Sequence, residues 1–245
     1  MYTNSGLSEL EKKKSLPIYS SGDLILDEIL SGGFHHDLIY LLYGDKRLIA
    51  TILQKTAVLS FRGKDFSKKV AYVDCINRFN PYNISKLAVS EGLPPVKVLE
   101  NILISRSFTW EQMVEVLENK ISTLKDIKIL MISGITSFWP NYEQLAFEQL
   151  LQAISGIKQT LFNSAPLTIL TAPLNKHSKF KPQGGKYLEH FGNVLVIINS
   201  KERKVEYRLI QHPFLPENVI SKQIPKQPKR GLKRPLKNST LDQWV

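Results

Sequence analysis

The chain has 245 residues, of which 42% are hydrophobic, which is enough for one well-buried core but short for two full domains. Its 33 basic and 22 acidic residues give a formal net charge of +11, so a polyanion, either nucleic acid or an acidic membrane surface, is the first partner to consider. The single cysteine, Cys75, excludes an intrachain disulfide and a cysteine-rich zinc site, and it favours a reducing compartment. No window approaches the roughly 20 apolar residues of a membrane span, so we expect a soluble, cytoplasmic protein with no membrane partner.

Strands and helices are predicted in alternation along most of the chain. Residues 1–15 are polar and are expected to form a tail. The apolar run Leu38–Tyr43 ends at Gly44-Asp45 and is typical of a buried parallel strand that meets a turn. The segments that follow are a helix at about 48–61, a strand at 70–74, a helix at 83–91, a strand at 101–105, a helix at 109–124, a strand at 127–132, a helix within 143–162 and a strand at 167–171. This order predicts an α/β fold with a mostly parallel central sheet flanked by helices.

The character of the chain changes near its C-terminal end. Residues 193–199 and 204–210 are separated by a short polar turn, which predicts an antiparallel hairpin that finishes the sheet. We therefore expect one domain over residues 16–216. Residues 217–237 are rich in lysine, arginine and proline, which predicts a disordered basic linker. Residues 217–245 contain seven basic and two acidic residues, so both the tail and the body carry net positive charge.

The turn after the first predicted long strand occupies the place where nucleotide-binding folds carry their phosphate loop. Residues 44–51 read GDKRLIAT, which fits the length of the pattern GxxxxGK[ST]. Only Gly44 and Thr51 match that pattern. Ile49 stands where the second glycine belongs, and Ala50 stands where the lysine belongs. The pattern needs glycine so that backbone N–H groups can wrap phosphates, and lysine as a point charge on the terminal phosphates, and both contributions are missing.

Several blocks of the chain resemble the archaeal RadA and RecA recombinase family in the same order and spacing. They extend over residues 16–216, and they are Ser20–Asp27, Leu30–Phe34, Val70–Asp74, Arg78–Pro81, Glu91–Leu93, Asn101–Phe108 and Gly184–Lys186. The resemblance implies a RecA-like core. The amino-terminal helical domain and the oligomerisation linker of that family have no counterpart in residues 1–15, so the resemblance does not imply self-stacking into filaments.

Carried over by position, the family's catalytic groups are missing together. Ser133 stands where the family has the acidic residue that orders magnesium and the attacking water, and Ile76 stands in place of its catalytic glutamate. With Ala50 in place of the lysine, no group remains to position Mg²⁺, phosphate or water. The resemblance thus implies an inactive ATPase with no catalytic residue and no cofactor. An alternative is that Lys46 or Arg47, displaced along the loop, restores phosphate binding.

A basic loop after the strand at 167–171 resembles the recombinase loop that lines the DNA channel. Lysines can neutralise phosphates while an aromatic or histidine ring stacks on exposed bases, a combination suited to single-stranded DNA. The alternative is a solvated surface loop with incidental lysines. The predicted DNA-binding residues are Lys176, His177, Lys179, Phe180, Lys181 and Lys186.

The last eight residues, 238–245, resemble the short motif by which replication and repair proteins bind the sliding clamp PCNA. Asn238, Leu241, Trp244 and Val245 take the positions of the motif's glutamine, aliphatic residue and two aromatics. One helical turn would place Leu241 and Trp244 on the same face. Asn238 and Val245 depart from the motif, and the alternative is a frayed terminus that carries Trp244 by chance.

These features predict a non-catalytic RecA-like accessory of DNA repair, recombination or damage-tolerant synthesis that binds DNA and the sliding clamp. A catalytic RadA recombinase or a DNA polymerase is a further candidate partner. The alternative function is a divergent DNA-dependent ATPase that acts as a recombination mediator. His35-His36 does not indicate a metal site, because adjacent histidines point apart on a strand and no further ligand stands at a supporting spacing.

Overall fold

The computed structural model describes residues 16–140, 143–178, 180–202 and 204–223. The predictions for residues 1–15, for Lys179, for residues 224–237 of the basic linker and for residues 238–245 lie outside these ranges. Among the described residues, no helix combines the length and the apolar character needed to cross a membrane.

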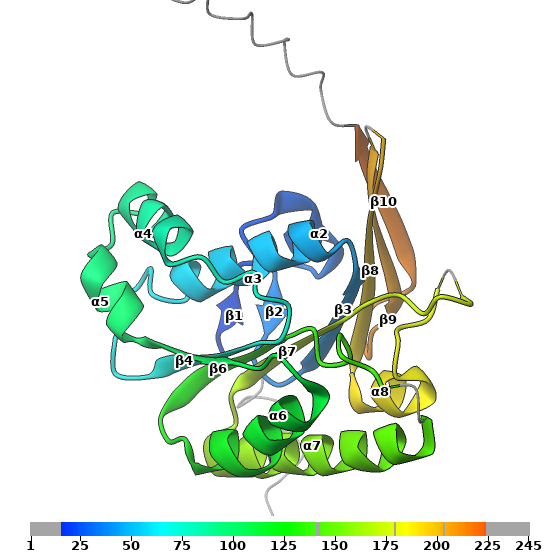
Figure 1. The fold of residues 1–245 in the computed structure, drawn as a ribbon. Helices are drawn as coiled ribbons and strands as arrows, with labels where there is room; N and C mark the ends of the chain where they lie inside the picture. The colour runs from blue at the N-terminus through cyan, green and yellow to red at the C-terminus, as the bar shows by residue number, and fades with distance from the viewer. Residues whose placement is uncertain (1–15, 141–142, 179, 203, 224–245) are drawn as a thin grey trace, which may run out of the picture.

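The described residues form one large sheet of eight strands (Figure 1), in the order β10-β9-β8-β3-β7-β6-β4-β5. Strands β3 to β8 run parallel to one another, and β9 and β10 add two antiparallel strands at the β8 edge. This arrangement confirms the predicted α/β class and the predicted C-terminal hairpin. The strands are β3 Ile39–Gly44, β4 Lys69–Asp74, β5 Ile102–Arg106, β6 Ile127–Ser133, β7 Leu167–Ala172, β8 Val194–Lys201, β9 Lys204–Gln211 and β10 Asn218–Gln223.

Helices cover both faces of the sheet, with α2 to α5 on one face and α6 to α8 on the other (Figure 1). Successive side chains of a strand point to opposite faces, so Leu42 and Tyr72 join the core under α2 to α5, whereas Leu41 and Val73 join the core against α6 to α8. Every residue of β6 and β7 is buried, as expected for strands covered on both faces. The helices are α2 Leu24–Ile29, α3 Lys46–Leu59, α4 Pro81–Ser90, α5 Pro95–Glu100, α6 Trp110–Glu115, α7 Glu143–Ser164 and α8 Gly185–Phe191.

A small two-stranded sheet precedes β3 and was not predicted. Strands β1 (Ile18–Tyr19) and β2 (Phe34–His35) pair antiparallel. The backbone N–H of His35 donates a 2.7 Å hydrogen bond to the hydroxyl of Tyr40, which ties this small sheet to β3. Two-residue strands are too short to produce a readable hydrophobic period.

The helix predicted at 109–124 is interrupted. After α6 the chain forms a π-helical turn, Val116–Lys120, and then a short 3₁₀ turn, Ile121–Thr123. The π-helical turn lies where Gly156 of α7 approaches closely, and a Cβ at Gly156 would overlap the carbonyl oxygen of Leu117. The absence of a side chain at Gly156 therefore allows the widened turn to pack against α7.

The sheet continues past residue 216, which corrects the predicted start of the linker. Asn218–Gln223 forms β10 and pairs with β9 along its full length. Ile220 of β10 packs partly against the core. Only Lys222 is basic within β10, so the composition of the linker as a whole hid a short strand at its start.

Candidate functional site

The parallel strands β3, β4, β6 and β7 all end at the same edge of the sheet, where ligands bind in open α/β folds. The residues at these ends are Gly44, Asp74, Ser133 and Ala172. The positions at which a phosphate loop and its catalytic partners were sought therefore lie together in space, as the resemblance implied.

The chain passes from β3 to α3 through one residue, Asp45. Helix α3 begins at Lys46, and Asp45 is its N-cap. The Asp45 carboxylate accepts hydrogen bonds from the backbone N–H groups of Arg47 at 2.8 Å and Leu48 at 3.1 Å. Free N–H groups at a helix start are what a bound phosphate would use. Here the protein's own carboxylate occupies them.

Gly44 has a role in the packing of β3 against β8. Its φ of +124° lies in a region that favours glycine, and a Cβ at this position would overlap the carbonyl oxygen of Ile198. The N–H of Asp45 donates a 2.7 Å hydrogen bond to the same carbonyl. The requirement for glycine is thus explained by the neighbouring strand.

The remaining positions at which the phosphate-loop pattern was sought lie within α3. Ile49 and Ala50 are each only 3% exposed and belong to the buried face of α3. Thr51 is exposed, and its hydroxyl donates a 2.9 Å hydrogen bond to the carbonyl of Arg47 one turn earlier. The backbone of these three residues is helical, so it does not form a loop that could wrap a phosphate.

Little space remains at the strand ends. The cavity lined by Gly44, Lys46, Ile49, Ile76 and Gly134, among others, has a volume of about 10 Å³. That is room for about one water molecule, whereas pockets for small ligands usually span roughly 300 Å³ or more. Ile76 packs so closely on Gly134 that a Cβ at the glycine would overlap the isoleucine side chain.

Two polar groups are buried beside this cavity. The Ser133 hydroxyl has no hydrogen-bond partner among the described residues. The Asp74 carboxylate accepts hydrogen bonds from the backbone N–H groups of Ile76, Arg78 and Phe79 at 3.3, 3.2 and 2.9 Å, so it holds the turn after β4. Burial raises the pKa of the adjacent Cys75 thiol to about 12, which leaves it protonated and unreactive at neutral pH.

The predicted DNA-binding loop follows β7 and is held as a narrow hairpin. Asn175 N–H donates to the Lys181 carbonyl and Gln183 N–H donates to the Pro173 carbonyl, each at 2.8 Å. The loop projects its polar and aromatic side chains outward. Those that are exposed are Lys176, His177, Phe180 and Lys181, together with Lys186 on α8.

Two residues that sequence reasoning missed support this loop. The guanidinium carbon of Arg208, on β9, lies 5.1 Å from the centre of the Phe180 ring, within the range of a cation–π contact. The Tyr43 hydroxyl at the end of β3 donates a 3.0 Å hydrogen bond to the Phe180 carbonyl. No local sequence signal joins these positions, because they come together only when the sheet forms.

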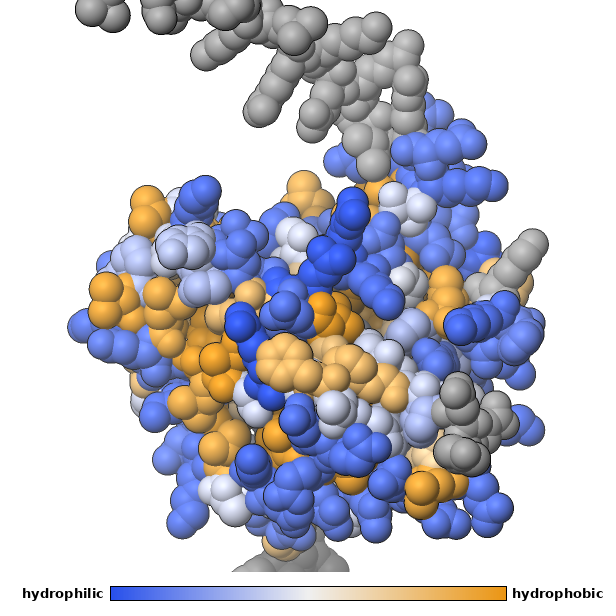
Figure 2. Space-filling view, in the orientation of Figure 1, coloured by the Kyte–Doolittle hydropathy of each residue, from blue (hydrophilic) through white to orange (hydrophobic). Residues whose placement is uncertain are grey.

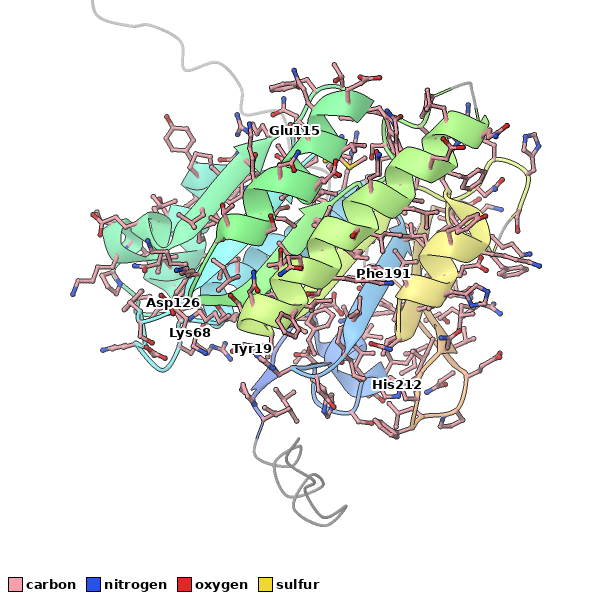
Figure 3. All side chains as sticks on the ribbon, turned by 90° about the horizontal axis from the view of Figure 1, so that it is seen from below. Tyr19, Lys68, Glu115, Asp126, Phe191 and His212 are labelled. Atoms are coloured by element: carbon pink, nitrogen blue, oxygen red, sulfur yellow. The ribbon has the colours of Figure 1, made fainter. Side chains whose placement is uncertain are left out.

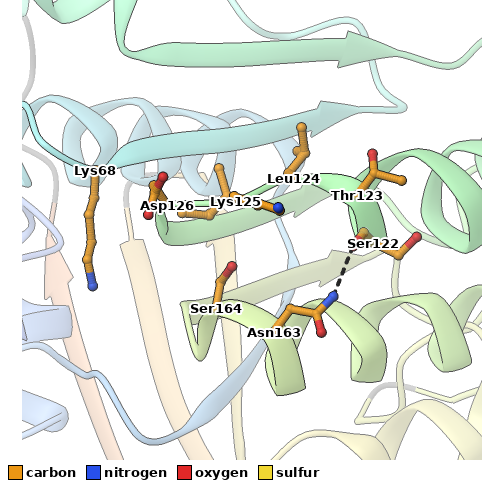
Figure 4. Close-up of a pocket in the computed structure, with 9 residues that line it drawn as sticks. Lys68, Ser122, Thr123, Leu124, Lys125, Asp126, Asn163 and Ser164 are labelled. Carbon is orange, nitrogen blue, oxygen red and sulfur yellow. Dashed lines mark hydrogen bonds between the residues drawn. The ribbon is translucent and has the colours of Figure 1, made fainter.

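A second hollow, of about 550 Å³, lies at the opposite edge of the sheet, where β4 and β6 begin (Figure 4). Tyr19, Lys68 and Asp126 lie near one another at this end of the molecule (Figure 3). The walls of this hollow include the C-terminal ends of α7 and of the 3₁₀ turn. Asn163 of α7 donates a 3.1 Å hydrogen bond to the Ser122 carbonyl. Helix C-termini present carbonyl oxygens, which disfavour anions, so this hollow is not the candidate polyanion site.

Exposed apolar side chains gather over α4 and α5 (Figure 2). Val89 of α4 and Val96 of α5 are exposed there. Ile104 of β5 and Phe108, two residues after the end of β5, are exposed as well. Within the described residues, β5 pairs only with β4, so its outer edge carries free backbone groups. Such an edge with apolar neighbours is a surface suited to another protein.

Across the described ranges, no three histidine, cysteine, aspartate or glutamate side chains gather in a way that could hold a metal ion. His35 lies on β2 and His36 follows it, and burial lowers the pKa of His36.

The sheet order, the position of the β3–α3 turn and the basic loop after β7 define the chain as a RecA-like core domain. A crystal structure of the RadB recombinase superimposes with a TM-score of 0.69 at 21% sequence identity, and the match covers 85% of this chain and 96% of that one. The chain belongs to the Rad51 family, whose profile matches residues 12–144.

Two relatives carry the same description, meiotic recombination protein DMC1 homolog. The protein from Glycine max is 29% identical over 242 residues, which cover 87% of this chain and 68% of that protein. The protein from Arabidopsis thaliana is 29% identical over 141 residues, which cover 55% of this chain. This chain spans 41% of the Arabidopsis protein.

Proposed function

We propose that this protein is a non-catalytic Rad51-family accessory of DNA recombination, repair or damage-tolerant synthesis, which binds single-stranded DNA and the sliding clamp without using ATP. One observation carries the proposal: the place of the phosphate loop is a capped helix start, with about 10 Å³ left at the strand ends. The same cap that completes α3 removes the backbone groups that a phosphate would need.

The chemistry of phosphoryl transfer supports this proposal. Enzymes accelerate that reaction mainly by positioning cations and orienting the attacking water, because the protein itself takes little part in covalent chemistry. Ala50 and Ile76 are apolar, and Ser133 carries a neutral hydroxyl. These three positions together supply neither a charge for the terminal phosphate nor a carboxylate for magnesium or water.

DNA binding rests on the loop after β7. Lys176, Lys181 and Lys186 are exposed on the loop or on α8, and the ring of Phe180 is partly exposed above Arg208. Cations that neutralise phosphates beside an aromatic ring are the usual components of a single-strand binding surface.

Protein partners are part of the proposal. The motif at 238–245 would tether the chain to the sliding clamp, and the exposed edge of β5 with Ile104 and Phe108 is a surface for a catalytic recombinase. A DNA polymerase bound to the same clamp would be brought near by that tether.

A divergent DNA-dependent ATPase that mediates recombination is the second candidate. The observation that favours it is that Lys46 lines the small cavity beside Gly44. If α3 unwound by one turn, this lysine would be placed to reach a phosphate.

The first experiment measures nucleotide binding by calorimetry and phosphate release with magnesium, with and without single-stranded DNA. We expect no binding heat and no turnover. Turnover that is stimulated by DNA and abolished by Lys46→Ala would instead establish the ATPase.

The second experiment measures DNA binding by fluorescence anisotropy across a salt series. Lys176→Ala/Lys181→Ala should weaken binding and lower the slope of log affinity against log salt by about one unit or more. The matched control is Lys120→Ala/Lys125→Ala, which removes the same charge from exposed positions away from the loop. Equal effects of the two double variants would reject the loop assignment.

A further inference from the structure

A groove separates α3 from α4 and the turn that precedes α4. Two hollows of about 580 and 210 Å³ share Thr51, Gln54 and Asn83 among their lining residues, so they form one continuous depression, here called the α3–α4 groove. It adjoins the cavity at the strand ends, and Arg47, Ala50 and Thr51 of α3, which belong to the segment where a phosphate loop was sought, form part of its wall.

All the charged side chains that line the α3–α4 groove are positive. Arg47, Arg78 and Lys86 line it and are exposed, and no acidic residue is among its lining residues. Within the described part of the chain, none of these three side chains forms an ion pair. Three cations around one depression repel one another, and an anionic ligand relieves that repulsion.

The wall that carries Arg78 is held in place from beneath. Gln54 is only 5% exposed, and its side-chain amide donates 3.2 Å hydrogen bonds to the carbonyls of Ala50 and Arg78. Its carbonyl accepts from the N–H of Asn80 at 3.4 Å. Asp74 accepts from the N–H of Arg78, as described above. The groove is therefore formed before a ligand arrives, which lowers the entropic cost of binding.

An exposed aromatic ring lies at the mouth of the groove. Tyr82 is 78% exposed in the first turn of α4, where Asn80 caps the helix by accepting from the N–H groups of Tyr82 and Asn83. The cap fixes the backbone from which the ring projects. An accessible ring beside cations is suited to a base whose phosphate the cations hold.

We propose that the α3–α4 groove binds the phosphodiester backbone of a single-stranded nucleic acid through Arg47, Arg78 and Lys86, with a base stacked on Tyr82. The inference rests on the proposed DNA-binding function but assigns a second surface, distinct from the loop after β7. A nucleic-acid strand fits this groove better than a free nucleoside triphosphate does. The cations are spread along the walls of the groove, as a series of phosphates requires. The backbone N–H groups of Arg47 and Leu48, which could bind a triphosphate, already donate to Asp45.

The test uses the full chain and fluorescein-labelled oligothymidylate in an anisotropy titration across a salt series. Arg47→Ala/Arg78→Ala/Lys86→Ala should lower affinity at least tenfold and reduce the slope of log affinity against log salt by about two units, as the loss of three phosphate contacts on a single strand requires. Arg47→Gln/Arg78→Gln/Lys86→Gln removes the same charge with longer side chains and should behave alike.

Tyr82 provides a separate readout. Tyr82→Ala should lower affinity about fivefold or more without changing the salt slope, because stacking does not release counterions, and Tyr82→Phe should retain binding. A 5-iodouridine-substituted oligonucleotide should photo-cross-link to Tyr82. Circular dichroism checks that each variant remains folded.

The outcomes separate this inference from the proposed function. If the groove variants bind with unchanged affinity and slope while Lys176→Ala/Lys181→Ala binds weakly, the groove inference is wrong and the proposed function stands. If millimolar ATP displaces the oligonucleotide from the wild type but not from the Arg47/Arg78/Lys86 variant, the groove is a free-nucleotide site and the inference is overturned. If the wild type does not bind the oligonucleotide, both fail.

Discussion

The hydroxyl of Tyr43 and the carbonyl of Phe180 are joined by a 3.0 Å hydrogen bond although they lie 137 residues apart in the chain. Burial raises the pKa of Tyr43, so the hydroxyl keeps its proton and remains a donor at physiological pH. The bond fixes the position of the basic loop relative to the end of β3. The loop is thereby connected to the same strand that would carry a phosphate loop.

Tyr43→Phe removes this bond and should loosen the loop. We expect the free energy of unfolding to fall by about 1 kcal/mol, the usual net value of one hydrogen bond. Hydrogen exchange of the loop amides, notably that of Gln183, should become faster while the amides of β6 stay protected. Unchanged exchange in the loop would mean that the Asn175 and Gln183 hydrogen bonds alone hold it.

Asp45→Ala tests the N-terminal cap of α3, at the place where a phosphate loop was sought. Loss of the carboxylate leaves the N–H groups of Arg47 and Leu48 unpaired, so chemical denaturation should show a loss of roughly 1 kcal/mol. Asp45→Asn keeps a side-chain acceptor and should retain most of the stability. Neither variant should bind ATP in calorimetry, because Ile76 still fills the strand ends. ATP binding by Asp45→Ala alone would show that the cap is what excludes the nucleotide.

Lys128 of β6 is 6% exposed, and its ammonium group donates to the carbonyls of Ser60 at 2.8 Å and Asp65 at 3.2 Å. It also lies 3.6 Å from the centre of the Phe61 ring. Burial lowers the pKa of Lys128 from 10.5 to about 8, and attraction to the Asp65 carboxylate opposes part of that shift. The hydrogen bonds of Lys128 thus hold the C-terminal end of α3. The same burial lets the ammonium group lose its proton at a lower pH than an exposed lysine would.

The lowered pKa of Lys128 predicts a rise in stability with pH. Between about pH 8 and 10.5 the unfolded chain binds this proton more tightly than the folded chain does, so deprotonation favours the folded state. Relative to Lys128→Met, the free energy of unfolding of the wild type should increase by roughly 2–3 kcal/mol across this window. Urea titrations at several pH values measure it. Parallel curves for the two proteins would contradict the lowered pKa.

The C-terminal motif predicts clamp binding by Leu241 and Trp244. Burial of the two side chains supplies on the order of 3–6 kcal/mol of gross hydrophobic free energy, and ordering of the tail opposes it, so the dissociation constant should lie near the micromolar range as an order-of-magnitude value. Trp244→Ala should abolish binding in calorimetry while leaving DNA affinity unchanged. A peptide of residues 233–245 should compete with the full chain, and a peptide without heat or competition would reject the motif.

Local patterns were sufficient for most of the fold. The strand at 127–132 and the helix within 143–162 could be predicted because a buried strand and an amphipathic helix each leave a periodic signal in the sequence. The interrupted helix after Glu115 and the strand at 218–223 could not. The first depends on the close approach of Gly156, and the second depends on pairing with β9, and neither contact has a local signature.

The sequence by itself determined which chemical groups are present. The identity of Ala50, at the position where a phosphate-loop lysine was sought, and the basic character of the loop after β7 can be read directly from the sequence. Only the tertiary structure decided which side chains fill the space at the strand ends and which groups contact the basic loop. Ile76 meets Gly134, Asp45 caps α3, and Arg208 reaches Phe180, because the sheet brings together strand ends that are distant in the chain. Residue type is a property of the chain, whereas free volume and side-chain proximity arise only when the parallel strands align their ends.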